Sequence, residues 1–399
     1  MFNVGNTFLL WASGIVFVAL IDFIVLIVAR LKQTNFISDN IDNDFTILVP
    51  IFNDTKYLKN VPFLEQYGNK VFILTSNQET PEFNQNIERI CNQHNFKLFK
   101  ADIKDNQEKT PWLLFSIALH GKAGINDMIN TNNIILIDGD TYTEANLGNL
   151  VASMNENKFD LASVKIMPDN PYSISEKLQN IEYFIAMQAR VIFPYLTSGA
   201  ALIGRKDALK RIYARHSMYF QAGDIEVGIL AKKIGYRVGY IPFEFFTEVP
   251  DGFKSLIKQR FSWASGTFRL FVVNIFQNLR NHPFEVVYTC FLIYILAVLK
   301  LWNFVLYFPL IAITCYCVYV LILSIIMFQE FTLIVILSPL YSFVQSVLIL
   351  PVGALIYIRR VMLSGNFGWI KISDPKRNAK LLVGDHSLHS NALGLNQPQ

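Results

Sequence analysis

The sequence predicts an α/β region with a mainly parallel sheet, placed between apolar segments long enough to cross a membrane. From about residue 31 to residue 282, apolar runs of strand length alternate with helical stretches, the pattern of a parallel layered structure. Elsewhere the apolar residues are concentrated in 8–29 and 283–358. The composition fits an average over two such parts: 17% of the residues are charged, whereas about 25% is usual for a soluble domain.

Residues 1–31 are predicted to form an uncleaved transmembrane anchor. The stretch 8–29 carries only Asp22 as a charge, and about 20 such residues span a bilayer as a helix. Arg30 and Lys32 follow this stretch, which places the rest of the chain on the cytoplasmic side. A cleaved signal peptide would instead have basic residues before a shorter apolar core.

Six strands are expected in the region 32–250, and the residues that follow each strand are the candidates for function. The reason is that ligands of open α/β sheets collect outside the carboxyl ends of the strands. The first strand is apolar throughout, as in a sheet covered on both faces. Helices are predicted over Pro111–His120 and Ile174–Val191. The six strands are Phe45–Ile51, Lys70–Thr75, Phe96–Phe99, Asn133–Ile137, Phe159–Met167 and Tyr236–Ile241.

Asp138, Gly139 and Asp140 directly follow the predicted strand Asn133–Ile137. Two carboxylates one residue apart repel each other unless a cation lies between them. Hard oxygen ligands of this kind suit Mg²⁺ or Mn²⁺, which commonly complete their coordination with substrate phosphates. An acidic surface turn is the alternative interpretation, but the position after a buried strand favours a site for a metal and a diphosphate.

Asp224 lies at the start of a helical stretch that ends near Gly235. In one interpretation Asp224 is the N-cap of this helix and Gly235 its C-terminal stop. In the other it is a general base, because a helix N-terminus and a nearby cation both favour the ionised carboxylate. The two roles are compatible.

Residues 251–282 are predicted to form an amphipathic helix at the membrane interface, because apolar residues recur there every three or four positions with basic residues between them. Trp263 is then either an interfacial anchor or a platform for an acceptor sugar. The nearly uncharged block 283–358 is expected to cross the membrane an even number of times, with a hairpin formed by 304–328 and 331–358. Residues 359–399 would form a cytosolic tail.

Taken in order, these segments resemble the membrane-integrated family 2 glycosyltransferases, the group that contains cellulose, hyaluronan, chitin and capsule synthases. The DGD turn is similar to the DxD motif of this family, and Lys109 lies where the family has the lysine of GKxxALN. The other similar segments are VPIFND at 49–54, SGAALIGRKDAL at 198–209, GDIEVGILAKKIGYRVGYIP from residue 223, which places Asp224 on the catalytic base, and KQRFSWASG at 258–266, which resembles QxxRW.

Two positions depart from the family pattern. The second strand ends in LTSNQE at 74–79, where the family commonly has an aspartate that contacts the nucleotide base, so base recognition would fall to Asn77 or to a backbone group. In the QxxRW segment, Gln259 and Trp263 match, but Ser262 occupies the arginine position. Arg260 is the adjacent candidate for contact with the diphosphate.

The resemblance implies a GT-A-like (Rossmann-like) cytosolic domain at 32–250 of a multi-pass protein of the cell membrane. The implied reaction is an inverting transfer from a nucleotide-diphosphate sugar, expected to be a UDP-sugar, to an acceptor hydroxyl. Asp224 would be the base, and Asp138 and Asp140 would hold Mg²⁺ or Mn²⁺. The implied donor-binding residues are Pro50, Asn53, Lys109, Asp138, Gln259 and Arg260, and the acceptor-binding residues are Ser198, Gly199 and Trp263.

Three functions remain open at this stage. The first is a synthase that extends a growing glycan, such as a cell-surface or capsular polysaccharide. The second is a non-processive transferase that adds one sugar to a lipid acceptor, and the third is a non-catalytic membrane scaffold or export partner. A net charge of +4 over 399 residues gives no reason to expect a nucleic-acid partner, and four scattered cysteines exclude a disulfide scaffold.

Overall fold

The structure is a computed structural model that describes residues 24–32, 36–103, 109–120, 125, 128–218, 221–281, 310, 314, 317, 321 and 334–363. The chain divides into two compact units. The sheet unit contains the described residues of Thr34–Asp169 and Phe193–Glu248, and the helical unit those of Met1–Gln33, Asn170–Ile192 and Val249–Trp369.

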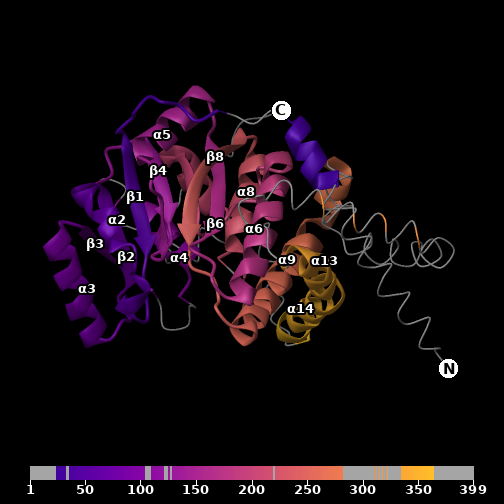
Figure 1. Cartoon of the computed structure of the whole chain (residues 1–399). Helices are drawn as coiled ribbons and strands as arrows, with labels where there is room; N and C mark the ends of the chain where they lie inside the picture. The colour runs from indigo at the N-terminus through magenta and orange to yellow at the C-terminus, as the bar shows by residue number, and fades with distance from the viewer. Residues whose placement is uncertain are drawn as a thin grey trace. The chain divides into compact units, whose positions relative to one another are not determined.

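The sheet unit is built on an eight-stranded sheet with the order β3-β2-β1-β4-β7-β6-β8-β5 (Figure 1). Its strands are β1 (Phe45–Pro50), β2 (Val71–Ser76), β3 (Lys97–Ala101), β4 (Asn133–Ile137), β5 (Thr141–Tyr142), β6 (Leu161–Pro168), β7 (Ala201–Arg205) and β8 (Val238–Thr247). Its α-helices are α2 (Val61–Glu65), α3 (Pro81–His94), α4 (Pro111–His120), α5 (Leu147–Glu156), α7 (Lys206–Tyr213) and α8 (Gly223–Ile234), and 3₁₀ turns lie at Thr55–Tyr57 and Gly68–Lys70.

All six predicted strands are present, with ends shifted by at most two residues except in β8, which continues six residues beyond its predicted end at Ile241. They run in the same direction as one another. The prediction of a mainly parallel sheet is therefore confirmed, but the sheet also contains β5 and β7, which run antiparallel to their neighbours. Strand β7 was not among the six predicted strands. Its five residues lead without a turn into α7, so no break in the sequence marks the strand.

Residues of β1 alternate between the two faces of the sheet, as the two-residue period of a strand requires. Leu48 belongs to the core formed with helices α4, α7 and α8, which includes Leu114 and Leu209. Phe45 instead meets the ring of Tyr67, with centroids 5.8 Å apart, and the Tyr67 hydroxyl accepts a hydrogen bond from the first residue of α5. Both faces of β1 are thus covered, as its continuous apolar sequence predicts.

The helical unit contains a helix over residues 24–31, α6 (Ile174–Ile192), α9 (Phe253–Asn281), α13 (Ile334–Val344) and α14 (Leu350–Tyr357), with π-helical turns at Gln345–Ile349 and Ile358–Met362. The helices predicted over 174–191 and 251–282 are confirmed as α6 and α9. Helix α14 packs closely on α9, because a Cβ added to Gly353 would lie only 2.5 Å from Cβ of Ala264.

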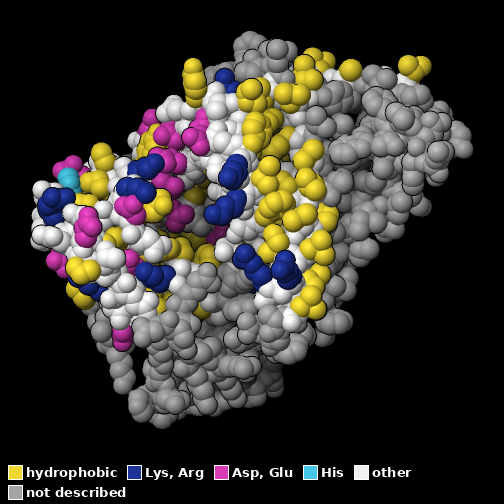
Figure 2. Space-filling view, turned by 90° about the horizontal axis from the view of Figure 1, so that it is seen from below, with side chains coloured by type: hydrophobic (Ala, Val, Ile, Leu, Met, Phe, Trp, Pro, Cys, Tyr) yellow, Lys and Arg dark blue, Asp and Glu magenta, His cyan; other side chains and the backbone are white. Residues whose placement is uncertain are grey.

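In the part of the chain that the structure describes, no helix has both the length and the apolar character needed to cross a bilayer. Residues 1–23 of the predicted anchor and most of 283–333 in the predicted membrane block lie outside the described residues, as do residues 364–399 of the predicted tail. On the face seen in Figure 2, exposed hydrophobic side chains gather in a band that has lysine and arginine side chains beside it.

Candidate active site

Asp138 and Asp140 lie on a tight turn at the end of β4. The backbone carbonyl of Asp138 accepts hydrogen bonds from Asn60 Nδ2 (3.0 Å) and from the Thr141 N–H (3.1 Å). Between the two acids, a Cβ at Gly139 would lie 2.3 Å from Ile51 Cδ1 and 2.8 Å from a backbone oxygen. Only glycine fits at this position, so packing against the end of β1 holds the turn in place.

The two carboxylates of this turn share an environment that disfavours negative charge. Burial raises the pKa of Asp138 well above its ordinary value, and the nearby charges of Asp140 and Asp224 raise it further. Burial also raises the pKa of Asp140. Hydroxyl groups orient the Asp140 carboxylate, since Oδ1 accepts from Thr141 Oγ1 (3.2 Å) and Thr247 Oγ1 (3.4 Å).

Asp224 lies in the first turn of α8. The N-cap is Ala222, with φ +62°, so the prediction that Asp224 itself is the N-cap is wrong by two residues. The reason is that Ala222 adopts a left-handed conformation, so the helix already begins at Gly223, one residue before Asp224. The carboxylate Oδ2 of Asp224 accepts a hydrogen bond from the Gly199 N–H at 2.9 Å. The side chain is thereby directed toward the loop before β7 instead of back along the helix.

One short loop, Thr197–Ala200, connects the two acidic segments. The Ala200 carbonyl accepts from the Asp138 N–H (2.9 Å), while Gly199 donates to the Asp224 carboxylate. The Thr197 hydroxyl donates to the Asp224 carbonyl. Ser198 and Gly199, predicted to bind the acceptor, therefore lie between the predicted metal site and the predicted base.

Buried side chains of other segments pack against the start of α8 and hydrogen-bond to it. His216 is fully buried, and its Nε2 donates to the Gly223 carbonyl (2.8 Å) while its Nδ1 accepts from the Met218 N–H (3.0 Å). A Cβ at Gly223 would lie 2.5 Å from the ring of Trp112. His216 was not among the predicted site residues, because no spacing pattern marks a histidine that binds a backbone carbonyl.

The predicted donor-binding residues Asn53 and Lys109 both contact Glu79, which was not predicted as a site residue. Glu79, in the loop after β2, accepts a hydrogen bond from the Asn53 N–H (3.0 Å) and forms an ion pair with Lys109 Nζ (2.8 Å). Pro50 is the last residue of β1. Asn77, one of the two options for base recognition, is bonded through its amide to Asp102 Oδ1 (2.7 Å) and to the Ile103 N–H (3.0 Å).

Gln259, Arg260 and Trp263 lie together on α9 in the helical unit. The Arg260 side chain is only 3% exposed, and its Nη2 forms an ion pair with Glu182 at 2.8 Å. Its Nη1 donates to Gln259 Oε1, and the guanidinium lies 4.2 Å from the centroid of the Trp263 ring. The roles of these three residues in binding donor and acceptor stay predictions.

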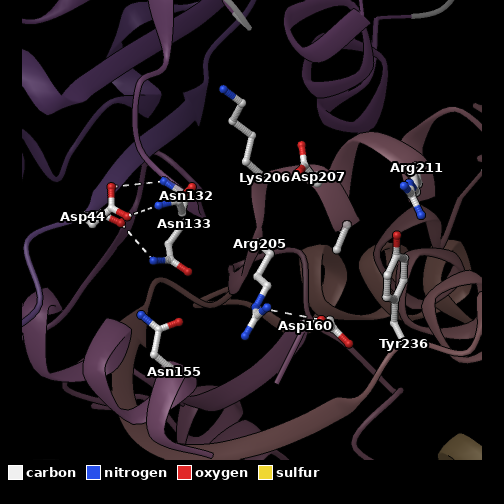
Figure 3. A pocket seen from close by; sticks show the side chains of 11 residues that line it. Asp44, Asn132, Asn133, Asn155, Asp160, Arg205, Lys206, Asp207, Arg211 and Tyr236 are labelled. Carbon is white, nitrogen blue, oxygen red and sulfur yellow. Dashed lines mark hydrogen bonds and ion pairs between the residues drawn. The ribbon is translucent and has the colours of Figure 1, made fainter. Parts of the chain in front are cut away.

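A cavity of about 600 Å³ lies at the opposite edge of the same sheet (Figure 3). Its lining comes from the amino ends of β1, β4 and β6 and from the start of α7, and it includes Asp44, Asn132, Asp160 and Arg205. None of the predicted site residues lines it.

The acidic turn can supply part of the coordination shell of a divalent cation. A bound ligand or water would have to supply the remaining coordination positions. No group of three histidine, cysteine or acidic side chains that could hold a metal is found among the residues described. Asp138 and Asp140 supply hard oxygen ligands whose charges oppose each other, and a cation would relieve this repulsion. Two carboxylates with the remaining ligands from phosphate or water are a common arrangement for Mg²⁺.

Comparison with known proteins decides the family. The profile described as "Glycosyl transferase family group 2" matches residues 133–358, more than half of the chain. The chain belongs to this glycosyltransferase family. The matched segment begins with β4 and contains the DGD turn, the loop Thr197–Ala200 and Asp224. The family resemblance stated from the sequence is therefore confirmed at this level.

One solved structure supports the fold of this family 2 chain. The mannosyltransferase PcManGT from Pyrobaculum calidifontis, solved in complex with GDP-Man and Mn²⁺, superposes with a TM-score of 0.56 at 12% identity. The match covers 88% of this chain and 99% of that one. S. aureus TarS 1–349 gives a TM-score of 0.35 at 18% identity and covers 56% of this chain and 65% of that one. Among curated proteins, none matches this chain.

Proposed function

We propose that this family 2 chain is a membrane-bound, metal-dependent, inverting glycosyltransferase that uses a nucleotide-diphosphate sugar, most simply a UDP-sugar. Its acceptor would be a hydroxyl group of a growing cell-surface or capsular glycan. One observation carries the proposal: Asp138, Asp140 and Asp224 come together at the carboxyl edge of the sheet, joined through the loop Thr197–Ala200. The GDP-Man and Mn²⁺ bound to the structurally similar mannosyltransferase support a nucleotide-sugar donor and a divalent metal.

In this proposal Asp224 is the general base. Its carboxylate accepts the proton of the acceptor hydroxyl while the hydroxyl oxygen forms a bond to the anomeric carbon of the donor sugar. The bond from that carbon to the diphosphate oxygen breaks, and the nucleoside diphosphate leaves with the electron pair. The Gly199 N–H bond to Asp224 Oδ2 orients the carboxylate, and a positioned base of this kind accelerates a reaction by about 10²–10⁴-fold.

Asp138 and Asp140 would hold Mg²⁺ or Mn²⁺, which would offset the negative charge that develops on the departing diphosphate. Asn53 and Lys109 would contact the donor, and the half-buried residues Ser198 and Gly199 would lie against the acceptor. Gln259, Arg260 and Trp263 keep the roles that the family resemblance implies.

The proposal places the enzyme in the cell membrane with the sheet unit in the cytoplasm. The apolar stretches 8–29 and 283–358 support this, as do exposed apolar side chains of the helical unit, such as Leu31, Leu348 and Leu355. We expect the protein to sediment with membranes and to be released by detergent but not by alkaline carbonate. Release by carbonate alone would contradict integral insertion.

The single-sugar alternative keeps one specific observation in its favour. Ser262 stands where processive members of the family have the arginine of QxxRW, and Arg260 beside it is engaged with Glu182. The length of the product distinguishes the two reactions, because a synthase yields a ladder of chain lengths and a non-processive transferase yields one addition.

The decisive experiment is to incubate the detergent-purified protein with a panel of UDP-, GDP- and other nucleotide sugars, with Mn²⁺, with Mg²⁺ or with EDTA. We expect release of one nucleoside diphosphate, dependent on metal, from wild type and not from Asp140→Ala. Absence of donor consumption under every condition would favour the scaffold alternative and overturn the proposed activity.

A further inference from the structure

Glu79 is a buried acid at the edge of the sheet where the donor is proposed to bind. It lies in the loop between β2 and α3, and its side chain is only 2% exposed. Its backbone is held in place by the start of α3, since its carbonyl accepts from Asn84 Nδ2 (3.1 Å) and Thr80 caps the helix by accepting from the Phe83 N–H (3.2 Å).

The two oxygens of Glu79 connect the end of β1 with the approach to α4. Oε2 accepts the Asn53 N–H at 3.0 Å, and Oε1 lies 2.8 Å from Lys109 Nζ. Asn53 is separated from Glu79 by 26 positions and Lys109 by 30. A carboxylate is costly to bury unless it is paired and hydrogen-bonded, and here both partners come from predicted donor-binding residues.

Each partner has a property that makes such an anchor useful. Asn53 has φ +69°, a left-handed conformation that asparagine adopts at a moderate cost, and its hydrogen bond to Glu79 holds the turn after β1. Lys109 is 24% exposed, and an ammonium group has three donors. One donor is directed to Glu79, which leaves two for a ligand.

We propose that Glu79 is a positioning residue for the donor: it holds Lys109 and the Asn53 turn in the arrangement that receives the diphosphate of a nucleoside diphosphate. The inference rests on the proposed function and adds a residue to its donor site. Protein kinases use the same division of labour, in which a glutamate holds the lysine that contacts the nucleotide phosphates. The buried carboxylate would not touch the nucleotide itself.

The test is calorimetric binding of UDP and of GDP, each with Mg²⁺, to the full-length protein in detergent. For whichever nucleotide wild type binds, we expect Glu79→Gln to weaken binding about tenfold, the order expected when a charge-assisted hydrogen bond that orders a contact is lost. Lys109→Met should weaken binding at least as much. The double variant should weaken binding by clearly less than the product of the two single effects, because Glu79 acts in part through Lys109.

The matched control is Glu88→Gln, which removes the acid of the solvent-exposed ion pair between Glu88 and Lys100 (2.6 Å). We expect it to leave the affinity within about twofold of wild type, since exposed pairs contribute little. If Glu79→Gln also stays within twofold, or if its effect simply adds to that of Lys109→Met, the positioning role is refuted.

Two further measurements keep the outcome unambiguous. Should Glu79→Gln not fold, as judged by thermal unfolding, Glu79→Asp keeps the charge but is one methylene too short to reach both partners, and we expect it to weaken binding at least threefold. Unchanged affinity in Glu79→Asp would then refute the inference. Failure of wild type to bind either nucleotide is a separate result, which would overturn the proposed function and the positioning role with it.

Discussion

Acidic side chains lie at both edges of the central sheet, but their partners differ. At the amino edge, Asp44 accepts two hydrogen bonds from Asn132, at 3.1 Å from the backbone N–H and 2.7 Å from Nδ2. Asp160 accepts from the Arg237 N–H at 2.9 Å and faces Arg205. At the carboxyl edge, the nearby charges of Asp140 and Asp224 raise the pKa of Asp138 beyond the effect of burial.

This difference favours the carboxyl edge as the proposed site. The amino edge has a cavity of about 600 Å³, and Asp44 and Asp160 there are hydrogen-bonded or ion-paired, as structural acids usually are. The carboxyl edge keeps its acids in mutual repulsion, which a protein tolerates where a ligand or a cation relieves it. The carboxyl edge is therefore the proposed site, although the cavity lies at the amino edge.

The largest expected effect that separates the two edges is on turnover. Asp224→Asn removes the proposed base and should lower the rate of nucleoside diphosphate release by about 10²–10⁴-fold, with donor affinity nearly unchanged in calorimetry. Asp160→Asn, at the amino edge, should keep wild-type turnover. If Asp224→Asn retained more than about a tenth of the rate, the assignment of the base would be wrong.

The second expected effect is on stability and concerns the amino edge instead of the carboxyl edge. Asp44→Ala removes the acceptor of both Asn132 bonds and should lower the free energy of unfolding by about 1–3 kcal/mol, the usual range for hydrogen bonds to a charged group. Denaturant unfolding measures this change. Turnover per folded molecule should not change, and a loss of turnover at wild-type stability would contradict the comparison.

A smaller effect of reversed sign is expected at Asp138. The fold raises the pKa of this carboxyl, so the folded state favours the protonated form. Its favourable contribution is full below the ordinary value of 3.8 and is lost as the pH rises through the raised pKa of the folded state. Asp138→Asn should therefore raise the unfolding temperature at neutral pH in EDTA, by about 2–4 °C for each 1 kcal/mol relieved.

The same variant should lose the response to metal. Mn²⁺ should raise the unfolding temperature of wild type, and more at pH 8 than at pH 5, because binding requires the ionised carboxylate. Asp138→Asn should show little increase. Equal stabilisation of both proteins by Mn²⁺ would place the metal elsewhere.

The smallest expected effect concerns backbone strain. Ala222, before α8, and Lys158, after α5, both have positive φ, at +62° and +57°. Glycine at either position should stabilise the protein by up to about 1 kcal/mol, because relief of left-handed strain exceeds the added freedom of the unfolded chain. Turnover should fall several-fold only in Ala222→Gly, which loosens the turn that presents Asp224. Equal turnover in both variants would show that this strain has no role in the reaction.

Sequence reasoning reached those parts of the site that follow from strand ends. The DGD turn was found because a buried apolar strand precedes it, and a strand of this kind directs the next residues to the ligand edge. Asp224 was found through its helix and the family pattern around it. Both are local signals, readable within about ten residues.

The parts that were missed depend on contacts between distant segments. Nothing near Glu79 in the sequence indicates that it meets Asn53 and Lys109, and nothing near His216 indicates a bond to the Gly223 carbonyl. Strand β7 was missed because its five residues pass directly into a helix. Its direction is set by pairing with β4 and β6, which a local pattern does not contain.

The reversed direction of β7 has a consequence for how the two halves of the chemistry could evolve. Strand β7 starts at the carboxyl edge of the sheet. The loop Thr197–Ala200 before it therefore hydrogen-bonds both to the turn after β4 and to the helix that bears the proposed base. We expect the insertion of a single residue in this loop to break both the Asp138–Ala200 and the Gly199–Asp224 hydrogen bonds. Such a chain would lose the proposed metal site and the proposed base together, so this stretch should tolerate side-chain exchange far better than any insertion or deletion.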